Sequence, residues 1–290
     1  MAFLALLVAM LILSSFAPAA KYIFVHSDLT PIELACVRVM IGFGFLCAAT
    51  AVWDRPSLIH LSGWDVAILS GLGIISVGIS YAVSAVGLQH TTVTNYVLIY
   101  SLTPAFTLLF SMLAGRDRVR VFKILGMLLS LLGCIFAVSE GTAGFAAHPL
   151  GFDFGESMIL LFTLLMSFTI VTGSPIVKRY GMMTANTVMF GSSFLLLLVG
   201  SLWWEPPPRE SLSLDTMLAL LYIGVTTAGV FLLRHYALRF LTPGTVAAFH
   251  NLVPIFGIAL AGALLGEAIT AHVVVGGMVI LLGVELVRRS

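Results

Sequence analysis

The sequence predicts an all-α membrane protein with ten transmembrane helices, arranged as two inverted five-helix repeats. Hydrophobic residues make up 60% of the 290 residues, charged residues only 9%, and the mean hydropathy is +1.10. A soluble domain carries about 25% charged residues. The charged residues here separate apolar runs of roughly 20 residues, the length that crosses about 30 Å of hydrocarbon. The lipid bilayer is therefore the main solvent of this fold.

The apolar runs between polar breaks define the predicted spans. They cover residues 2–26, 31–52, 64–88, 92–114, 121–139, 156–177, 184–204, 216–238, 243–265 and 271–287. The first run is expected to be a span rather than a secretory signal peptide, because residues 1–20 contain no Lys or Arg. A longer outer link, 141–155, divides the chain into a first repeat, 1–140, and a second repeat, 156–290.

Lys and Arg predict the orientation, since positive residues in short loops stay on the cytoplasmic side. With both termini in the cytoplasm, Arg209 is the one positive residue assigned to an outer loop. The cytoplasmic ends then carry Arg55, Arg116, Arg118, Arg120, Lys123, Lys178, Arg179, Arg239, Arg288 and Arg289. An N-in, C-in topology is therefore expected.

The second half of the chain matches the first at an offset of 150 residues. The matching pairs are Leu88 and Leu238, Thr92 and Thr242, Pro104 and Pro254, Gly126 and Gly276, Leu131 and Leu281, Leu132 and Leu282, and Gly133 and Gly283. Five spans is an odd number, so the second half enters the membrane from the opposite side. Inverted repeats are typical of secondary transporters, whose substrate sites lie near the midplane between the halves.

Several motifs of the second half follow one another in a characteristic order. They are Tyr236–Leu238, Asn251–Pro254, the Leu-Leu-Gly-Glu run at Leu264–Glu267 with Thr270, and Gly276–Val284. They resemble the EamA-like, ten-helix branch of the drug/metabolite transporter superfamily. Pro31 and Arg38 resemble the family's second-span motif, whereas Leu113–Asp117 departs from its Leu-Leu-Gly-Glu pattern. The resemblance implies a monomer or dimer in the bacterial inner membrane, often an exporter of amino acids or other small metabolites.

Polar residues on two spans form the predicted substrate site. Tyr96 and Tyr100 share one helix face, and Tyr100 and Ser101 lie one turn before Pro104. Each proline is expected to kink its span and to free a backbone carbonyl for substrate or water. At the matched depth, span nine carries His250, Asn251 and Pro254, and span three adds Tyr81. Polar helix packing is the alternative use of these residues.

Charged residues within spans are costly and mark candidate functional positions. Arg234 is expected either to bind a substrate carboxylate or phosphate, or to extend to the inner membrane surface. Lys21, Glu33 and Arg38 are expected to form an ion cluster that joins spans one and two, with substrate binding as the alternative. His250, or His235 nearer the inner face, is the candidate for proton coupling.

Other functional classes receive less support from the sequence. No glycine-rich phosphate loop is present, so ATP hydrolysis is not expected, and no basic patch with interleaved aromatic residues predicts a nucleic-acid partner. The cysteines and histidines show no metal-site spacing, and no cofactor is expected. We expect a secondary transporter, not an enzyme, that exports a small polar metabolite such as an amino acid by alternating access. A passive channel or receptor is the alternative, with an intramembrane enzyme less favoured.

Overall fold

The computed structural model describes residues 2–53, 61–115, 120–138, 153–180, 182–203, 212–238 and 252–289, and all regular elements in these ranges are helical. The elements are α1 (Ala2–His26), α2 (Pro31–Trp53), α4 (Gly63–Gly73), the π-helical turn η1 (Ile74–Ile79), α5 (Ser80–Gln89), α6 (Val93–Tyr100), α7 (Thr103–Leu113), α8 (Val121–Val138), α10 (Phe154–Tyr180), α11 (Met182–Trp203), α12 (Leu214–Leu238), α14 (Leu252–Leu265) and α15 (Ala271–Arg289). The prediction of an all-helical membrane protein is confirmed.

By length and composition, six apolar helical stretches in the described chain are long enough to cross a membrane. The shorter apolar helices among these residues are Val121–Ala137, Leu214–Val230, Leu252–Leu265 and Ala271–Leu286. Together these stretches correspond to the ten predicted spans. The structure contains no bilayer, so the N-in, C-in orientation stays a prediction.

The predicted span 92–114 is two helices rather than one kinked helix. α6 ends at Tyr100, and α7 begins at Thr103 with Pro104 in its first turn. Proline has no N–H and so cannot bond the carbonyl of Tyr100. The Thr103 hydroxyl donates to that carbonyl instead, at 2.6 Å. Discontinuous helices of this kind are common at transporter binding sites.

Contacts between helices follow the inverted repeat. α1 of the first half packs against α12 and α14 of the second half, and the equivalent helix α10 packs against α5 and α7. These two sets of contacts exchange when every residue number is shifted by 150. The two halves are therefore interlocked, and the central pocket described below lies where they meet.

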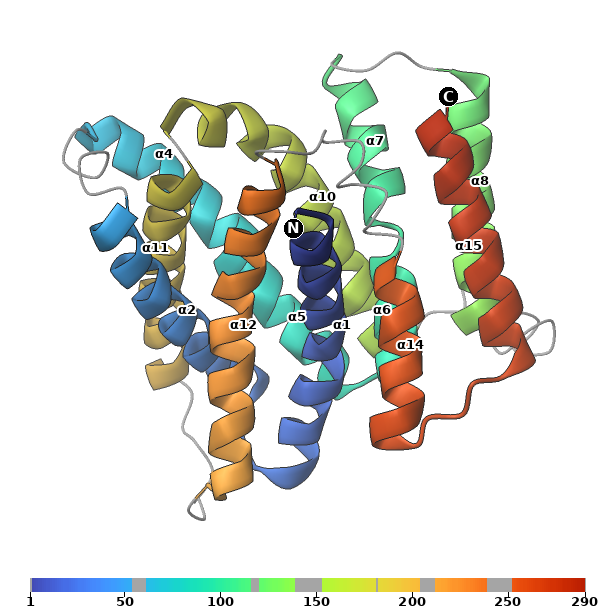
Figure 1. The fold of residues 1–290 in the computed structure, drawn as a ribbon, viewed down its shortest axis with the longest axis horizontal. Helices are drawn as coiled ribbons and strands as arrows, with labels where there is room; N and C mark the ends of the chain where they lie inside the picture. The colour runs from blue at the N-terminus through green and yellow to red at the C-terminus, as the bar shows by residue number, and fades with distance from the viewer. Residues whose placement is uncertain are drawn as a thin grey trace.

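The helices α8 and α15 lie side by side at one edge of the molecule (Figure 1). Small residues allow their backbones to approach closely. A Cβ added at Gly133 would lie 2.9 Å from the carbonyl of Gly276, and one added at Gly283 would lie 2.6 Å from the carbonyl of Gly126. The two glycine pairs are repeat equivalents of each other, and their crossed order shows that the two helices run antiparallel.

Candidate functional site

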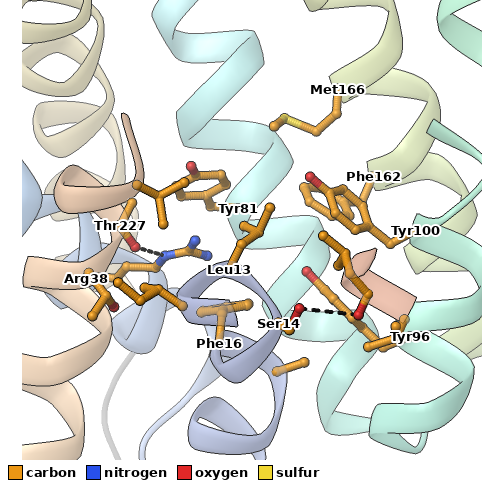
Figure 2. A pocket seen from close by; sticks show the side chains of 16 residues that line it. Leu13, Ser14, Phe16, Arg38, Tyr81, Tyr96, Tyr100, Phe162, Met166 and Thr227 are labelled. Atoms are coloured by element: carbon orange, nitrogen blue, oxygen red, sulfur yellow. Dashed lines mark hydrogen bonds between the residues drawn. The ribbon is translucent and has the colours of Figure 1, made fainter. Parts of the chain in front are cut away.

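A central pocket lies at about mid-length of α1, α10 and α12 (Figure 2). Its volume is about 70 Å³, several times the roughly 10–15 Å³ that one water molecule requires. The lining residues come from both halves: Ile12, Leu13, Ser14, Phe16, Ala17, Arg38, Tyr81, Tyr96, Val97, Tyr100, Phe162, Met166, Thr226, Thr227, Val230 and Val253. The pocket can thus hold a small organic molecule or several waters.

Two repeat-equivalent pairs contribute to this lining. Ile12 on α1 corresponds to Phe162 on α10, and Phe16 corresponds to Met166. The same two positions of the first helix of each repeat therefore form pocket wall. The pocket thus takes residues from both halves, as expected for an inverted-repeat transporter.

Arg38 supplies the charge of the pocket lining. Its side chain is buried, and its Nε donates a hydrogen bond of 2.8 Å to the Thr227 hydroxyl on α12. The guanidinium carbon lies 3.7 Å from the centre of the Phe16 ring and 4.0 Å from the centre of the Tyr81 ring. Cation–π attraction and the bond to Thr227 therefore hold the guanidinium in place.

An aromatic stack forms another part of the wall. The Tyr100 and Phe162 rings lie 5.5 Å apart at an interplanar angle of 16°, and the Tyr96 ring stacks on both. The Tyr96 hydroxyl is 3.1 Å from the Ser84 hydroxyl. These rings provide a large apolar surface with fixed geometry, which suits a ligand that has a flat or apolar body.

The π-helical turn η1 lies directly before Tyr81. π-helical turns occur frequently at functional sites, because they change the direction of the side chains that follow. The carbonyl of Gly73, at the start of the turn, accepts a hydrogen bond of 2.8 Å from the Ser193 hydroxyl on α11. Ser80 donates back to the Ile75 carbonyl at 2.7 Å. Serines thus stabilise the irregular turn that precedes Tyr81.

Two serine–carbonyl hydrogen bonds connect the halves beside the prolines. Ser14 on α1 donates to the carbonyl of Val253 at 3.2 Å, and Ser167 on α10 donates to the carbonyl of Thr103 at the same distance. Thr103 and Val253 are repeat equivalents, and each precedes one of the paired prolines. The residue before each of the matched prolines therefore accepts a hydrogen bond from the first helix of the other half.

The α5–α6 link is joined to the second half by two carboxylates. Glu267 accepts hydrogen bonds from the Val93 and Thr94 backbone N–H groups at 2.8 and 2.9 Å, and from the Thr94 hydroxyl at 2.6 Å. Glu156 accepts from the Thr91 hydroxyl and from the side-chain amide of Asn95. These bonds hold the halves together at the lower end of the molecule in Figure 1.

The two parts of the chain on either side of residues 140–152 each match the same family model. The model of the EamA-like transporter family matches residues 1–139 and again residues 153–289. The chain belongs to the EamA-like transporter family. It is therefore a multi-pass membrane transporter with two repeats, and the resemblance noted in the sequence is confirmed.

Relatives of this EamA-like transporter cover nearly its whole length. An "uncharacterized transporter" of Archaeoglobus fulgidus is 27% identical over 272 residues, covering 92% of each chain. The "uncharacterized transporter YdeK" of Bacillus subtilis is 26% identical over 289 residues, covering 97% of this chain and 95% of its own. A crystal structure with 17% sequence identity superimposes with a TM-score of 0.68 over 98% of this chain and 95% of the other, which shows a shared fold.

The structure brings some of the predicted substrate residues of the transporter together. Tyr81, Tyr96 and Tyr100 all line the pocket. Ser101 instead donates to the Leu98 carbonyl at 2.6 Å, and neither it nor Pro104 is part of the lining. Pro254 is buried in α14, next to the lining residue Val253. His250, Asn251 and the side chains of Arg234 and His235 lie outside the described residues.

Arg38 has different neighbours from those expected of the predicted ion cluster. Lys21 donates to the backbone carbonyls of Leu88, at 3.0 Å, and Thr91, at 2.7 Å. Glu33 accepts from the backbone N–H of Thr30 at the start of α2. Arg38 instead lies in the pocket among Phe16, Tyr81 and Thr227. The sequence places all three near one end, but helix rotation and neighbouring rings decide where each side chain points.

Sequence reasoning did not assign Phe162 and Met166 to the pocket, because single apolar residues on a span carry no distinguishing signal. At the 150-residue offset they correspond to Ile12 and Phe16 on the first span, which are equally apolar and carry no distinguishing signal either. Thr226 and Thr227 lie on the same span as Arg234 but were not predicted as part of the site. The partner of Thr227, Arg38, follows only from the packing of α2 against α12.

Proposed function

We propose that this transporter is a secondary carrier that moves a small metabolite, such as an amino acid, through the central pocket by alternating access, in the direction of export. The observation that carries the proposal is the composition of the pocket wall. The pocket lies at mid-length of the helices. Its wall contains equivalent residues of the two inverted halves, Ile12 with Phe162 and Phe16 with Met166. Two interlocked inverted repeats around one site suit a rocking motion that exposes the site to each side in turn.

The paired serine bonds support the same motion. Ser14 to Val253 and Ser167 to Thr103 each join the first helix of one half to the proline-containing helix of the other. The acceptor carbonyls are repeat equivalents, and Ser167 lies three residues beyond the position equivalent to Ser14. A rocking movement of one half against the other changes both contacts. The residues of the pocket also suit a small metabolite, because they combine one cation, several hydroxyl groups and aromatic rings.

Side-specific labelling of a single pocket cysteine tests alternating access. We would replace Cys36, Cys47 and Cys134, introduce Thr226→Cys, and reconstitute the protein in liposomes with a known orientation. A membrane-impermeant maleimide is expected to reach this cysteine from one side, with the accessible side changing when a transported solute is added. Access from both sides at once, with flux far above carrier rates, would indicate a channel instead.

A transport assay identifies the substrate and tests the carrier mechanism. Proteoliposomes loaded with an unlabelled metabolite are expected to accumulate the labelled form by counterflow, which a carrier performs and a channel does not. A panel of amino acids and related acids would identify the substrate. If no solute shows saturable counterflow in a preparation whose fold is intact, the carrier proposal is wrong.

A further inference from the structure

The guanidinium of Arg38 has one edge left for a ligand. Phe16 and Tyr81 lie 3.7 and 4.0 Å from its central carbon, and Thr227 accepts from Nε. Neither Nη atom makes a hydrogen bond to the part of the chain that the structure describes. Neither is completely buried, so both remain accessible from the pocket. Figure 2 shows these nitrogens beside the pocket interior. Two parallel N–H donors on one edge match the two oxygens of a carboxylate.

In the part of the chain that the structure describes, no carboxylate pairs with Arg38. The acidic residues within the described ranges are Asp28, Glu33, Asp65, Asp153, Glu156, Asp215, Glu267 and Glu285. None of them lines the pocket. The sequence of residues 231–251 also contains no Asp or Glu. A buried cation among apolar helices is unfavourable, so an anion in the pocket would stabilise it.

The rest of the pocket indicates what this anion carries. The stack of Tyr96, Tyr100 and Phe162 lines the same cavity as Arg38, and Leu13 and Met166 add apolar wall. A ligand whose charged group meets Arg38 therefore places its remaining atoms against rings and aliphatic side chains. Such a surface favours an aromatic or otherwise apolar body over a strongly hydrated one.

We propose that Arg38 binds the carboxylate of an organic acid with an apolar or aromatic body, and that the ligand needs no amino group. The inference deepens the proposed function, since it takes the central pocket as the transport site. The lining that the structure describes contains no Asp or Glu to neutralise an α-ammonium, and the positive charge of Arg38 would repel it. Deaminated acids should therefore bind at least as tightly as the amino acids of the same shape.

A set of four ligands of one shape tests this charge requirement on the intact protein. 3-Phenylpropionate carries only the acid, L-phenylalanine the acid and the amine, 2-phenylethylamine only the amine, and 3-phenylpropionamide a neutral isostere of the acid. Binding to the purified protein would be measured by calorimetry and by the shift in melting temperature. We expect the acid to bind about tenfold or more tighter than the amide and the amine, and at least as tightly as phenylalanine.

Arg38→Gln, which removes the charge, should abolish the preference for the acid over the amide. Arg38→Lys should retain part of it, because a single ammonium lacks the paired donors. Arg289→Gln, at an exposed position of α15, is the control and should leave all four affinities unchanged. If Arg38→Gln does not fold, the acid-to-amide affinity ratio of Arg38→Lys decides the role of the side chain, and an unchanged ratio would overturn it.

The possible results separate the inference from the proposed function. Equal binding of acid, amide and amine to the unmodified protein would overturn the carboxylate site while leaving the carrier proposal intact. Tighter binding of the amine would also overturn it. Acid-selective binding that depends on Arg38, without counterflow of any acid, would support the site and count against the carrier. Acetate, which has the carboxylate but no apolar body, is an additional test ligand. If acetate binds as tightly as 3-phenylpropionate, the proposed role of the aromatic wall is wrong.

Discussion

The Ser130 hydroxyl on α8 donates a hydrogen bond of 3.3 Å to the carbonyl of Ile280 on α15, its own counterpart at the 150-residue offset. A contact between equivalent positions can occur only where the symmetry axis of the two halves passes. A glycine contact lies on either side of this axis, Gly133 with Gly276 and Gly126 with Gly283. The 150-residue offset converts each of these contacts into the other. The α8–α15 pair is thus a symmetric scaffold, and neither helix contributes to the pocket lining.

Adjacent glycines on α15 should respond differently to substitution. At Gly276 a new Cβ would overlap Ala137 and the backbone of Gly133, whereas at Gly277 it would lie 3.8 Å from Leu98. Alanine favours a helix over glycine by about 1 kcal/mol at both positions. We expect Gly276→Ala to destabilise the protein by roughly 1–3 kcal/mol, as overpacking does elsewhere, and Gly277→Ala to be neutral or stabilising.

Melting of the two purified variants in the same detergent provides the measurement. Because both substitutions are identical in chemistry and adjacent in sequence, the difference between their melting temperatures isolates the helix contact. Equal melting temperatures would show that the α8–α15 approach is looser than the structure describes.

Thr227 should position Arg38 for its ligand. Its hydroxyl donates to the Ile223 carbonyl at 2.6 Å and accepts from Arg38 Nε at 2.8 Å. Thr227→Val removes the acceptor at nearly constant volume and leaves a donor on a buried cation unpaired. We expect 3-phenylpropionate to bind about tenfold more weakly, with little change for the amide.

Thr227→Ser keeps the hydroxyl and is the matched control, with an affinity expected within about twofold of the unmodified protein. The ratio of acid to amide affinity is the informative quantity, since a general loss of pocket structure would weaken both ligands. An unchanged ratio in Thr227→Val would argue against a positioning role.

Phe162 should set the preference for an aromatic body. Its ring is buried and stacks on Tyr96 and Tyr100. In Phe162→Leu, the stacking lost is worth about 0.5–1.5 kcal/mol. We expect the affinity ratio of 3-phenylpropionate to hexanoate to fall by roughly threefold to tenfold, as measured by competition binding.

Phe168→Leu on the same helix is the comparison, because Phe168 pairs with Phe110 outside the pocket lining. This variant should keep the ratio of the unmodified protein. A ratio that falls equally in both variants would point to a general effect on α10 instead of a contact with the ligand.

Glu267 should stabilise the start of α6. It accepts from two backbone N–H groups and the Thr94 hydroxyl, and carboxylates at helix N-termini are favourable. Gly266, with φ of 68°, ends α14 in the left-handed conformation that glycine favours and lets the chain turn there. We expect Glu267→Ala to lower stability by about 1–2 kcal/mol, measured as a fall in melting temperature.

Asp215→Ala removes an exposed acid from the first turn of α12 and is the control. It should lower the melting temperature less, because an exposed charge at a helix end contributes only about 0.3–1 kcal/mol. If the melting temperature falls equally in both variants, the hydrogen bonds of Glu267 to α6 stabilise the protein no more than an exposed charge at a helix end does.

Much of this architecture was predictable from one sequence. Runs of apolar residues define the helices, since the bilayer permits few alternatives, and the 150-residue offset predicts both the repeat and the pairing of Pro104 with Pro254. Tyr81, Tyr96 and Tyr100 also reach the predicted cavity. These features depend on composition and on spacing within one helix, which a sequence displays directly.

The sequence by itself therefore determined a helical membrane fold in two related halves, and the tyrosines that line its centre. Only the tertiary structure decided that Arg38 lies between Phe16 and Tyr81, that Thr227 orients it, and that Phe162 completes the aromatic wall. These relationships join helices far apart in the chain. Because a span is apolar on most faces, its pattern does not show which face packs inward, so the side chains that share a pocket emerge only when the helices are assembled.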